Sequence, residues 1–483
     1  AAQLSGALTM SFGETSGDVT VTGGSVGNEI DFGNTLDSKD VVTGGAGFDS
    51  VTAIVDGLTA ETGALKIANV ETINLSAVEE AGTVDASGIT LATGSVTVNV
   101  SGDESVTLLN VGANISTIVS TQGETGGLNV SFVSGSEAVE VTGGAGNDTI
   151  NFGSTLNSLD SVDGGDGEDT VNATIDGLKV YFADSGVSTG ELNIENVEII
   201  NLTTTGEDSQ VALLNLSEGA KVNVTGTSSL NIYLDAGTEL DASGLTGDAS
   251  LSANYWGSLD STKVVGSGNE DVVSAVLSDY MTISEPTVVA GPEISGVEKI
   301  RLTTVESATL DASKISGSVV YEIGSFEEVP EGQGLMGINV AEGLRIVNIG
   351  TDDVEVNATG WTGDLYGWDR DGYQAIAYNE YLSVDFGKNL TSGDKVIGAA
   401  TSKTTVSATL VDGETSSATL TNVGTINLLV EGETTATFDG GMITSTDKGL
   451  TSISLSDGIG GGTLGSYIAT EAAAQTAMDE ARA

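Results

Sequence analysis

A long internal repeat constrains this chain more than any other feature. Residues 21–58 align without a gap with residues 141–178, at an offset of 141 − 21 = 120. Each segment leads to a second shared string, which reads IANVETINL at 67–75 and IENVEIINL at 194–202. A self-similar chain folds as a stack of equivalent structural units, so we expect a repeat architecture.

Degenerate third and fourth copies extend the repeat over most of the chain. VVGSGNEDVVSAVL (264–277) precedes ISGVEKIRL (294–302), and VIGAATSKTTVSATL (396–410) precedes LTNVGTINL (420–428). The copies predict the following segments: β-repeat unit 1 with paired glycine turns (1–140), β-repeat unit 2 with a second pair of such turns (141–262), a degenerate unit 3 (263–350), a degenerate unit 4 with an aromatic-rich segment (351–465) and a helical tail (466–483).

Composition and spacing favour an all-β fold. The chain has 67 Gly and 3 Pro, and short pieces rich in Val, Ile and Thr recur about every ten residues between glycine turns. Such spacing suits either a β-solenoid of stacked coils or tandem β-sandwich domains. We favour β-solenoid or β-roll-like units, because the connections are short and similar and because stacking pairs nearly every strand edge. The C-terminal SYIATEAAAQTAMDEARA (466–483) is the one segment that predicts a helix.

The charge balance excludes several classes of function. There are 69 Asp and Glu against 15 Lys and Arg, a formal net charge of −54, so we expect no nucleic-acid or anionic-membrane partner. His and Cys are both absent, which excludes His-based triads, Cys nucleophiles, His/Cys zinc sites and disulfides. No run of eighteen apolar residues occurs, so no transmembrane segment is expected.

Three turns match the pattern G-G-x-G-x-D-x-U-x, where U is a large aliphatic residue. They begin at Gly44, Gly143 and Gly164. Glycine permits the tight backbone that turns carbonyl oxygens inward, and Asp adds a carboxylate at the end of the turn. Calcium needs about 6–8 oxygen ligands, more than one turn supplies, so a second stacked turn must complete the shell. The predicted metal-binding residues are Gly23, Glu29, Asp31, Gly44, Gly45, Gly47, Asp49, Gly143, Gly144, Gly146, Asp148, Gly164, Gly165, Gly167 and Asp169.

The turns are spaced to meet on one edge of a solenoid. They begin at 23 and 44 and again at 143 and 164, a separation of 21 in both units, which is one full coil. Stacked turns would lie ~4.8 Å apart and could share an ion. We expect Asp148 to pair with Asp169, and Asp49 with Asp31 or Glu29. The alternative for any single turn is an ordinary glycine turn without metal.

These turns resemble the RTX calcium-binding repeats, whose nonapeptides form parallel β-rolls in exported bacterial proteins. Mixed with strings such as NVETINL and VDASG (84–88), they look particularly like RTX-bearing surface-layer proteins. This chain has isolated pairs of turns in place of tandem arrays, and its fourth copy has lost the carboxylates. The resemblance implies Ca²⁺ as cofactor, an extracellular location at the bacterial cell surface, calcium-dependent folding and self-assembly into a lattice or filament.

Other motifs have plainer interpretations. VDASG and LDASG (240–244) are predicted solenoid corners in which Asp caps a turn. Asp369-Arg370-Asp371-Gly372 is either a solvated turn or a calcium loop. The aromatic cluster of Trp361, Tyr366, Trp368 and Tyr373 either packs beneath a local loop, stacks on sugar rings or docks a neighbouring subunit.

Three function hypotheses follow from these features. The first is an exported, calcium-stabilised structural protein that assembles with itself into a surface layer or extracellular filament. The second is a monomeric, calcium-dependent adhesin or polysaccharide-binding protein whose partner is a cell-surface polysaccharide. The third, a polysaccharide-cleaving enzyme, lacks any marked pair of catalytic carboxylates, so we expect no enzymatic activity.

Overall fold

Alternation of apolar and polar residues builds the strands of this protein. In the computed structural model, β7 (Thr72–Ala77) buries Ile73 and Leu75, while Thr72 and Asn74 face outward. The same pattern recurs along the chain and sends one row of aliphatic side chains from each strand into a continuous core. Aromatic residues stack within that core, with ring centroids of Phe132 and Phe152 5.0 Å apart.

The structure describes most of the chain up to residue 457. The described residues are 7–13, 17–59, 63–123, 125–133, 138–179, 181–182, 188–189, 192–214, 216–257, 259, 261–277, 287–289, 291–304, 308–324, 343–347, 349, 354–358, 381–398, 403–410, 415–430, 437–439, 443–444 and 452–457. The predicted C-terminal helix, the aromatic cluster and Asp369–Gly372 lie outside them. The one helix among the described residues is the 3-10 turn η2 (Ala86–Gly88).

Parallel pairing defines the fold. Each strand pairs with the strand one coil further along, as Glu140 does with Ser161 and Thr149 with Thr170. Among the described pairs only β18 (Tyr181–Phe182) and β19 (Ser188–Thr189) are antiparallel. The predicted all-β solenoid is therefore confirmed, and tandem sandwiches built from antiparallel hairpins are excluded.

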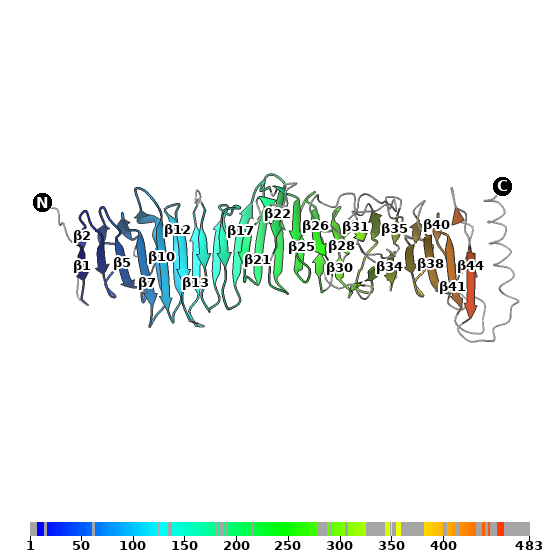
Figure 1. The fold of residues 1–483 in the computed structure, drawn as a ribbon, viewed down its shortest axis with the longest axis horizontal. Helices are drawn as coiled ribbons and strands as arrows, with labels where there is room; N and C mark the ends of the chain where they lie inside the picture. The colour runs from blue at the N-terminus through cyan, green and yellow to red at the C-terminus, as the bar shows by residue number, and fades with distance from the viewer. Residues whose placement is uncertain are drawn as a thin grey trace, which may run out of the picture. The chain divides into compact units, whose positions relative to one another are not determined.

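The chain divides into two units, the first ending at Leu230 and the second running from Asn231. Three ladders of strands form the first unit (Figure 1). Sheet I consists of β2 (Thr20–Thr22), β4 (Val41–Thr43), β6 (Lys66–Ala68) and β9 (Ile89–Thr90). Sheet II consists of β1 (Leu8–Ser11), β3 (Asn28–Asp31), β5 (Ser50–Ile54), β7, β10 (Val96–Gly102), β12 (Ile115–Ser120), β14 (Glu140–Thr142), β16 (Ser161–Asp163) and β20 (Asn193–Glu195). Sheet III includes β8 (Gly82–Asp85), β11 (Val106–Val111), β13 (Leu128–Phe132), β15 (Thr149–Gly153), β17 (Thr170–Ile175), β21 (Ile199–Thr204) and β23 (Lys221–Gly226). The unit also contains β22 (Ser209–Leu213).

The second unit repeats this construction. One ladder contains β25 (Glu239–Leu245), β27 (Lys263–Val265) and β30 (Glu293–Ser295). A second contains β24 (Leu230–Leu234), β26 (Leu251–Gly257), β28 (Val272–Leu277), β31 (Lys299–Thr304), β33 (Val320–Gly324), β35 (Glu355–Asn357), β37 (Lys395–Ile397), β40 (Thr419–Thr421) and β43 (Ile443–Thr444). A third contains β29 (Thr287–Val289), β32 (Ala308–Asp311), β34 (Gly343–Val347), β36 (Tyr381–Asp385), β38 (Lys403–Leu410), β41 (Thr425–Val430) and β44 (Ser452–Asp457), and β39 (Thr415–Ser417) pairs with β42 (Thr437–Asp439).

Equivalent strands of the repeat lie in different sheets. The turn at 44–48 leads from β4 in sheet I to β5 in sheet II, whereas the turn at 164–168 leads from β16 in sheet II to β17 in sheet III. The exchange occurs just after the NVETINL string, where β7, β8 and β9 place one strand in each of the three sheets. The first two repeats therefore share sheet II. Equivalent strands of the two repeats nevertheless lie on different sides of the core. The segment boundaries predicted from the repeat stay predictions.

The first glycine of each turn stacks directly on the next coil. Its N–H donates to a carbonyl one coil further on, as Gly143 does to the Asp163 oxygen at 2.8 Å. A Cβ on Gly143 would lie 1.8 Å from the Gly164 oxygen and 2.2 Å from Asp148 Oδ2. Glycine is required here by the backbone contact between coils.

We therefore expect Gly143→Ala to destabilise the first unit. Relief of the clash must separate two hydrogen-bonded coils, which should lower the free energy of unfolding by about 3 kcal/mol or more. Guanidinium unfolding followed by circular dichroism measures this change. Gly112→Ala is the matched control, because a Cβ at Gly112 has nothing within 4 Å; equal stability of the two variants would contradict the stacking argument.

Candidate metal centre and buried carboxylate ladder

The aspartate that ends each glycine turn points into the coil. Asp49, Asp148, Asp169 and Asp271 are each at most 1% exposed. Each lies just before a strand, at the point where the chain passes from the turn into the core. These four aspartates therefore lie where water does not reach them.

Each buried carboxylate binds the main chain of the preceding coil. Asp148 Oδ1 accepts the N–H of Leu128 at 2.6 Å, and Asp169 Oδ1 accepts the N–H of Asp148 at 2.7 Å. Asp49 and Asp271 accept the N–H groups of Asn28 and Leu251 in the same way, at 2.7 and 2.6 Å. Hydrogen bonds to a charged acceptor are about twice as strong as neutral ones, so these carboxylates hold successive coils together.

The glutamate of the recurring strings NVE (69–71 and 196–198) and GVE (296–298) closes this carboxylate ladder. Glu71 Oε2 accepts the N–H of Asp49 at 2.7 Å, and Glu198 Oε2 accepts the N–H of Asp169 at 2.8 Å. Glu298 Oε2 likewise accepts the N–H of Asp271 at 2.8 Å. In the coil that has no glycine turn, the longer side chain of Glu accepts the backbone N–H that Asp accepts elsewhere. Sequence analysis found this string but assigned it no role.

The second carboxylate oxygen differs between the sites. Asp148 Oδ2 accepts the N–H of Gly144 at 2.9 Å, and Asp271 Oδ2 accepts the N–H groups of Ser267 and Gly268 at 2.5 and 3.1 Å. Asp49 Oδ2 and Asp169 Oδ2 are buried without any hydrogen-bond partner. An unpartnered buried carboxylate oxygen is costly, and a cation is one group that would satisfy it.

Burial and neighbouring charge make Asp169 a weak acid for an aspartate. Burial raises the pKa of Asp169 to about 7, with further repulsion from Asp148, Glu198 and Asp163. Burial also raises the pKa of Asp148 from its usual value. The site thus concentrates negative charge that the protein alone compensates only in part.

The structure brings some of the predicted pairs together and separates others. Asp148 and Asp169 occupy successive coils and share a hydrogen bond, as the 21-residue spacing predicts. Glu29 and Asp31 are exposed and lie on the outer face of β3, so neither pairs with the buried Asp49. The equivalent position is taken by Asn28, whose Nδ2 donates to Asp49 Oδ1 at 2.5 Å. The prediction of an Asp49–Asp31 or Asp49–Glu29 pair was wrong, because side chains alternate along β3 and the register places Asn28 inward.

The predicted glycines form the turn backbone above the carboxylates. The second and third glycines have positive φ at Gly45 (121°), Gly47 (130°), Gly165 (98°) and Gly167 (134°). The carbonyl of Gly144 accepts the Asp166 N–H at 3.0 Å. Gly23, Gly44 and Gly164 make the same close inter-coil contact as Gly143, and Gly146 packs against the Gly126 oxygen.

Each of two sites has one unpartnered carboxylate oxygen that a hard dication could take as a ligand. The unpartnered oxygens of Asp49 and Asp169 are suitable anionic ligands for calcium. Across the part of the chain that the structure describes, no three acidic side chains converge to form a metal site by themselves. Main-chain carbonyls would therefore have to supply most of the 6–8 oxygens that calcium needs.

A second row of buried aspartates lies on the opposite turns, and sequence analysis missed it. Asp160 Oδ1 accepts the Val139 N–H of the preceding coil at 2.9 Å, and its Oδ2 accepts the Asn157 N–H at 2.8 Å. Asp40 and Asp394 make the equivalent bonds. Each of these aspartates stands three residues after Asp37, Asn157 or Thr391 in the sequence. That spacing is an ordinary turn pattern, so it did not indicate a buried carboxylate.

The corner prediction is confirmed for VDASG (84–88), where Asp85 Oδ1 accepts the Ser87 N–H at 3.0 Å at the start of η2. It was wrong for LDASG (240–244), which lies inside β25, although Asp241 Oδ1 still accepts the Ser243 N–H at 2.9 Å. Neither aspartate takes part in the carboxylate ladder.

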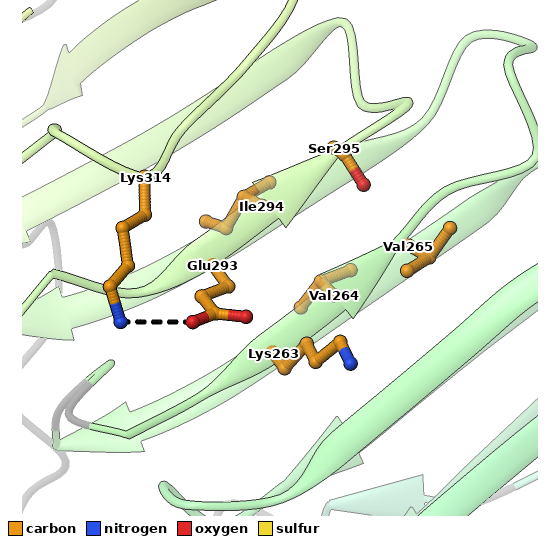
Figure 2. Close-up of a pocket in the computed structure, with 7 residues that line it drawn as sticks. All are labelled: Lys263, Val264, Val265, Glu293, Ile294, Ser295 and Lys314. Atoms are coloured by element: carbon orange, nitrogen blue, oxygen red, sulfur yellow. Dashed lines mark hydrogen bonds and ion pairs between the residues drawn. The ribbon is translucent and has the colours of Figure 1, made fainter.

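A shallow groove of about 390 Å³ lies over β27 and β30 in the second unit. Figure 2 shows Glu293 between Lys263 and Lys314, with a 2.9 Å ion pair to Lys314 Nζ. Lys263 is also paired in register with Glu239. The charges therefore alternate along the groove, and its two lysines leave no surplus positive charge for an anionic ligand.

Comparison of the chain with protein-family models, with curated proteins and with solved structures finds no match. The described residues contain no helix that is long and apolar enough to cross a membrane.

We expect Asp148→Ala to destabilise the first unit by about 3–5 kcal/mol, because two backbone N–H groups lose a charged acceptor inside the protein. Denaturant unfolding measures the change. Asp166→Ala removes a neighbouring but exposed carboxylate and should change stability by less than about 0.5 kcal/mol. A similar loss in both variants would mean that the ladder does not hold the coils.

The pKa of Asp169 also predicts a pH dependence in the absence of metal. Because its pKa of about 7 in the folded state exceeds the usual value near 3.8, the folded state binds the proton more tightly than the unfolded chain does. This contribution to stability is fully present below about pH 4 and is lost as the pH rises to 7. Thermal melts in chelator between pH 4 and 8 should show this loss, and Asp169→Asn should flatten it; an unchanged pH profile in the variant would contradict the assignment.

Proposed function

We propose that this chain is an exported, calcium-stabilised structural protein that assembles with copies of itself into a surface layer or extracellular filament at the bacterial cell surface. The observation that carries the proposal is the pair of unpartnered buried oxygens on Asp49 and Asp169, at equivalent points of the first two repeats. Calcium would take these oxygens together with main-chain carbonyls of the glycine turns. No catalytic role is proposed.

The net charge supports a role for a dication. At −54, the folded protein repels itself and repels its copies. Ions bound only in the folded state would stabilise it by mass action, about 2.7 kcal/mol per site at a free concentration of 100 Kd. Extracellular calcium modules have Kd values of about 10⁻⁴–10⁻³ M, so calcium would favour the folded, assembled protein outside the cell.

The fold supports a structural role. Parallel coils pair their strands with neighbours along each unit, and the carboxylate ladder links coils at the turns. Such a repetitive stack within each unit suits a structural building block.

Calcium removal tests the proposal. We expect the melting temperature in ~2 mM calcium to exceed that in EDTA by ~10 °C, and ordered assemblies seen by electron microscopy to dissolve in EDTA. The double variant Asp49→Asn/Asp169→Asn should lose the calcium-dependent increase and the heat of calcium binding in calorimetry.

The control for that variant is Glu140→Gln/Glu168→Gln, which removes the same charge from exposed positions. It should retain the calcium response of the wild type. Identical melting of the wild type in calcium and in EDTA would refute calcium stabilisation.

A further inference from the structure

The outer face of sheet III carries no carboxylate over six consecutive strands. This holds for every described outward-facing residue from β11 to β23, although the chain has 69 acidic residues. The one charged residue on this face is Lys221. We call this surface the neutral face; its outward residues are Thr107, Leu109, Asn110, Asn129, Ser131, Thr149, Asn151, Gly153, Thr170, Asn172, Thr174, Ile199, Asn201, Thr203, Lys221, Asn223 and Thr225.

A ladder of hydrogen-bonded asparagines runs along the neutral face. The Nδ2 of Asn172 donates to Asn151 Oδ1, that of Asn201 to Asn172 Oδ1 and that of Asn223 to Asn201 Oδ1, each at 2.8 Å. Beside the ladder, the hydroxyls of Thr203 and Thr225 lie 3.2 Å apart. Side chains that are already bonded to each other lose little conformational freedom when another surface covers them.

We propose that the neutral face binds the neutral face of a second copy of this chain. This inference rests on the self-assembly proposed above and names the surface that it uses. Copies with a charge of −54 repel each other, so they can meet closely only where carboxylates are absent. A second copy offers an equivalent face without carboxylates, and two such faces can pack about 10 Å apart as sheets do in a sandwich.

The size of the face sets the strength of the contact. Six strands at ~4.8 Å spacing span ~24 Å, and strands of 5–6 residues extend ~17 Å, which gives roughly 400 Å². A stable pairwise interface buries about 800 Å² on each partner, so one neutral face makes a weak dimer.

Sheet II supplies a second carboxylate-free surface. The described outward residues of β5, β7, β10 and β12 are Ser, Thr, Asn, Val, Ile and Gly, and the adjacent β3 and β14 bear Glu29, Asp31 and Glu140. The exchange of sheets along the repeat puts this surface on the other side of the core from the neutral face. Two weak contacts on different sides favour cooperative growth of an assembly over a closed dimer.

A single added carboxylate tests the inference. In ~2 mM calcium, Thr203→Glu places two glutamates in each pair of neutral faces and should weaken self-association at least ~10-fold in sedimentation velocity. Thr203→Ser adds no carboxylate to the face and should associate as the wild type does. Leu159→Glu adds the same charge at a turn residue that is 72% exposed and should also leave association unchanged. Circular dichroism melts of all three variants establish that each is folded.

The outcomes separate this inference from the proposed function. If the wild type assembles and Thr203→Glu assembles equally well, the neutral face is not the contact, although self-assembly stands. If the wild type stays monomeric with and without calcium, both proposals fail. If Thr203→Glu loses only retention on a neutral polysaccharide column, the face binds glycan and the choice of a second copy is overturned.

Discussion

The structure depends on one interaction, a buried carboxylate that accepts a backbone N–H from the neighbouring coil. In a parallel stack the strand hydrogen bonds end where the chain turns, and the N–H groups at that point need another acceptor. Asp148 and Asp169 supply it on one row of turns, and Asp160 supplies it on the opposite row. Because the acceptors are carboxylates, the groups that link the coils also bring negative charge inside them, and burial raises the pKa of Asp169 to about 7.

The glycine turns and the buried carboxylates link the coils together. A glycine backbone lets consecutive turns stack in contact, and this leaves no room for any side chain except the aspartate folded beneath it. Where the turn changes, the acceptor changes as well. In the NVE coils a residue in the left-handed region, Asn69 (φ 52°) or Asn196 (φ 51°), replaces the glycine turn, and a glutamate reaches the N–H that an aspartate reaches elsewhere. The two carboxylate oxygens left without a partner, Asp49 Oδ2 and Asp169 Oδ2, lie at equivalent points of the first two repeats.

Charge is distributed unevenly over the solenoid. Most of the acidic residues that the structure describes lie outside the strands, whereas the outward positions from β11 to β23 are mostly Thr and Asn. These six strands therefore present a face without carboxylates between turns that are rich in them. For a protein that repels its own copies, this arrangement separates the surfaces that allow contact from those that prevent it.

The sequence by itself determined the all-β repeat, the one-coil spacing of the glycine turns and the Asp cap of the VDASG corner, because each depends on local backbone preferences and on periodicity. It also brought Asp148 and Asp169 into successive coils. Only the tertiary structure decided that Asn28 and not Asp31 faces Asp49, that Glu198 continues the carboxylate ladder, and that equivalent strands of the repeat change sheets. Those outcomes depend on strand register and on which coil lies next to which, and residues about 20–30 positions apart meet only after the whole stack has formed.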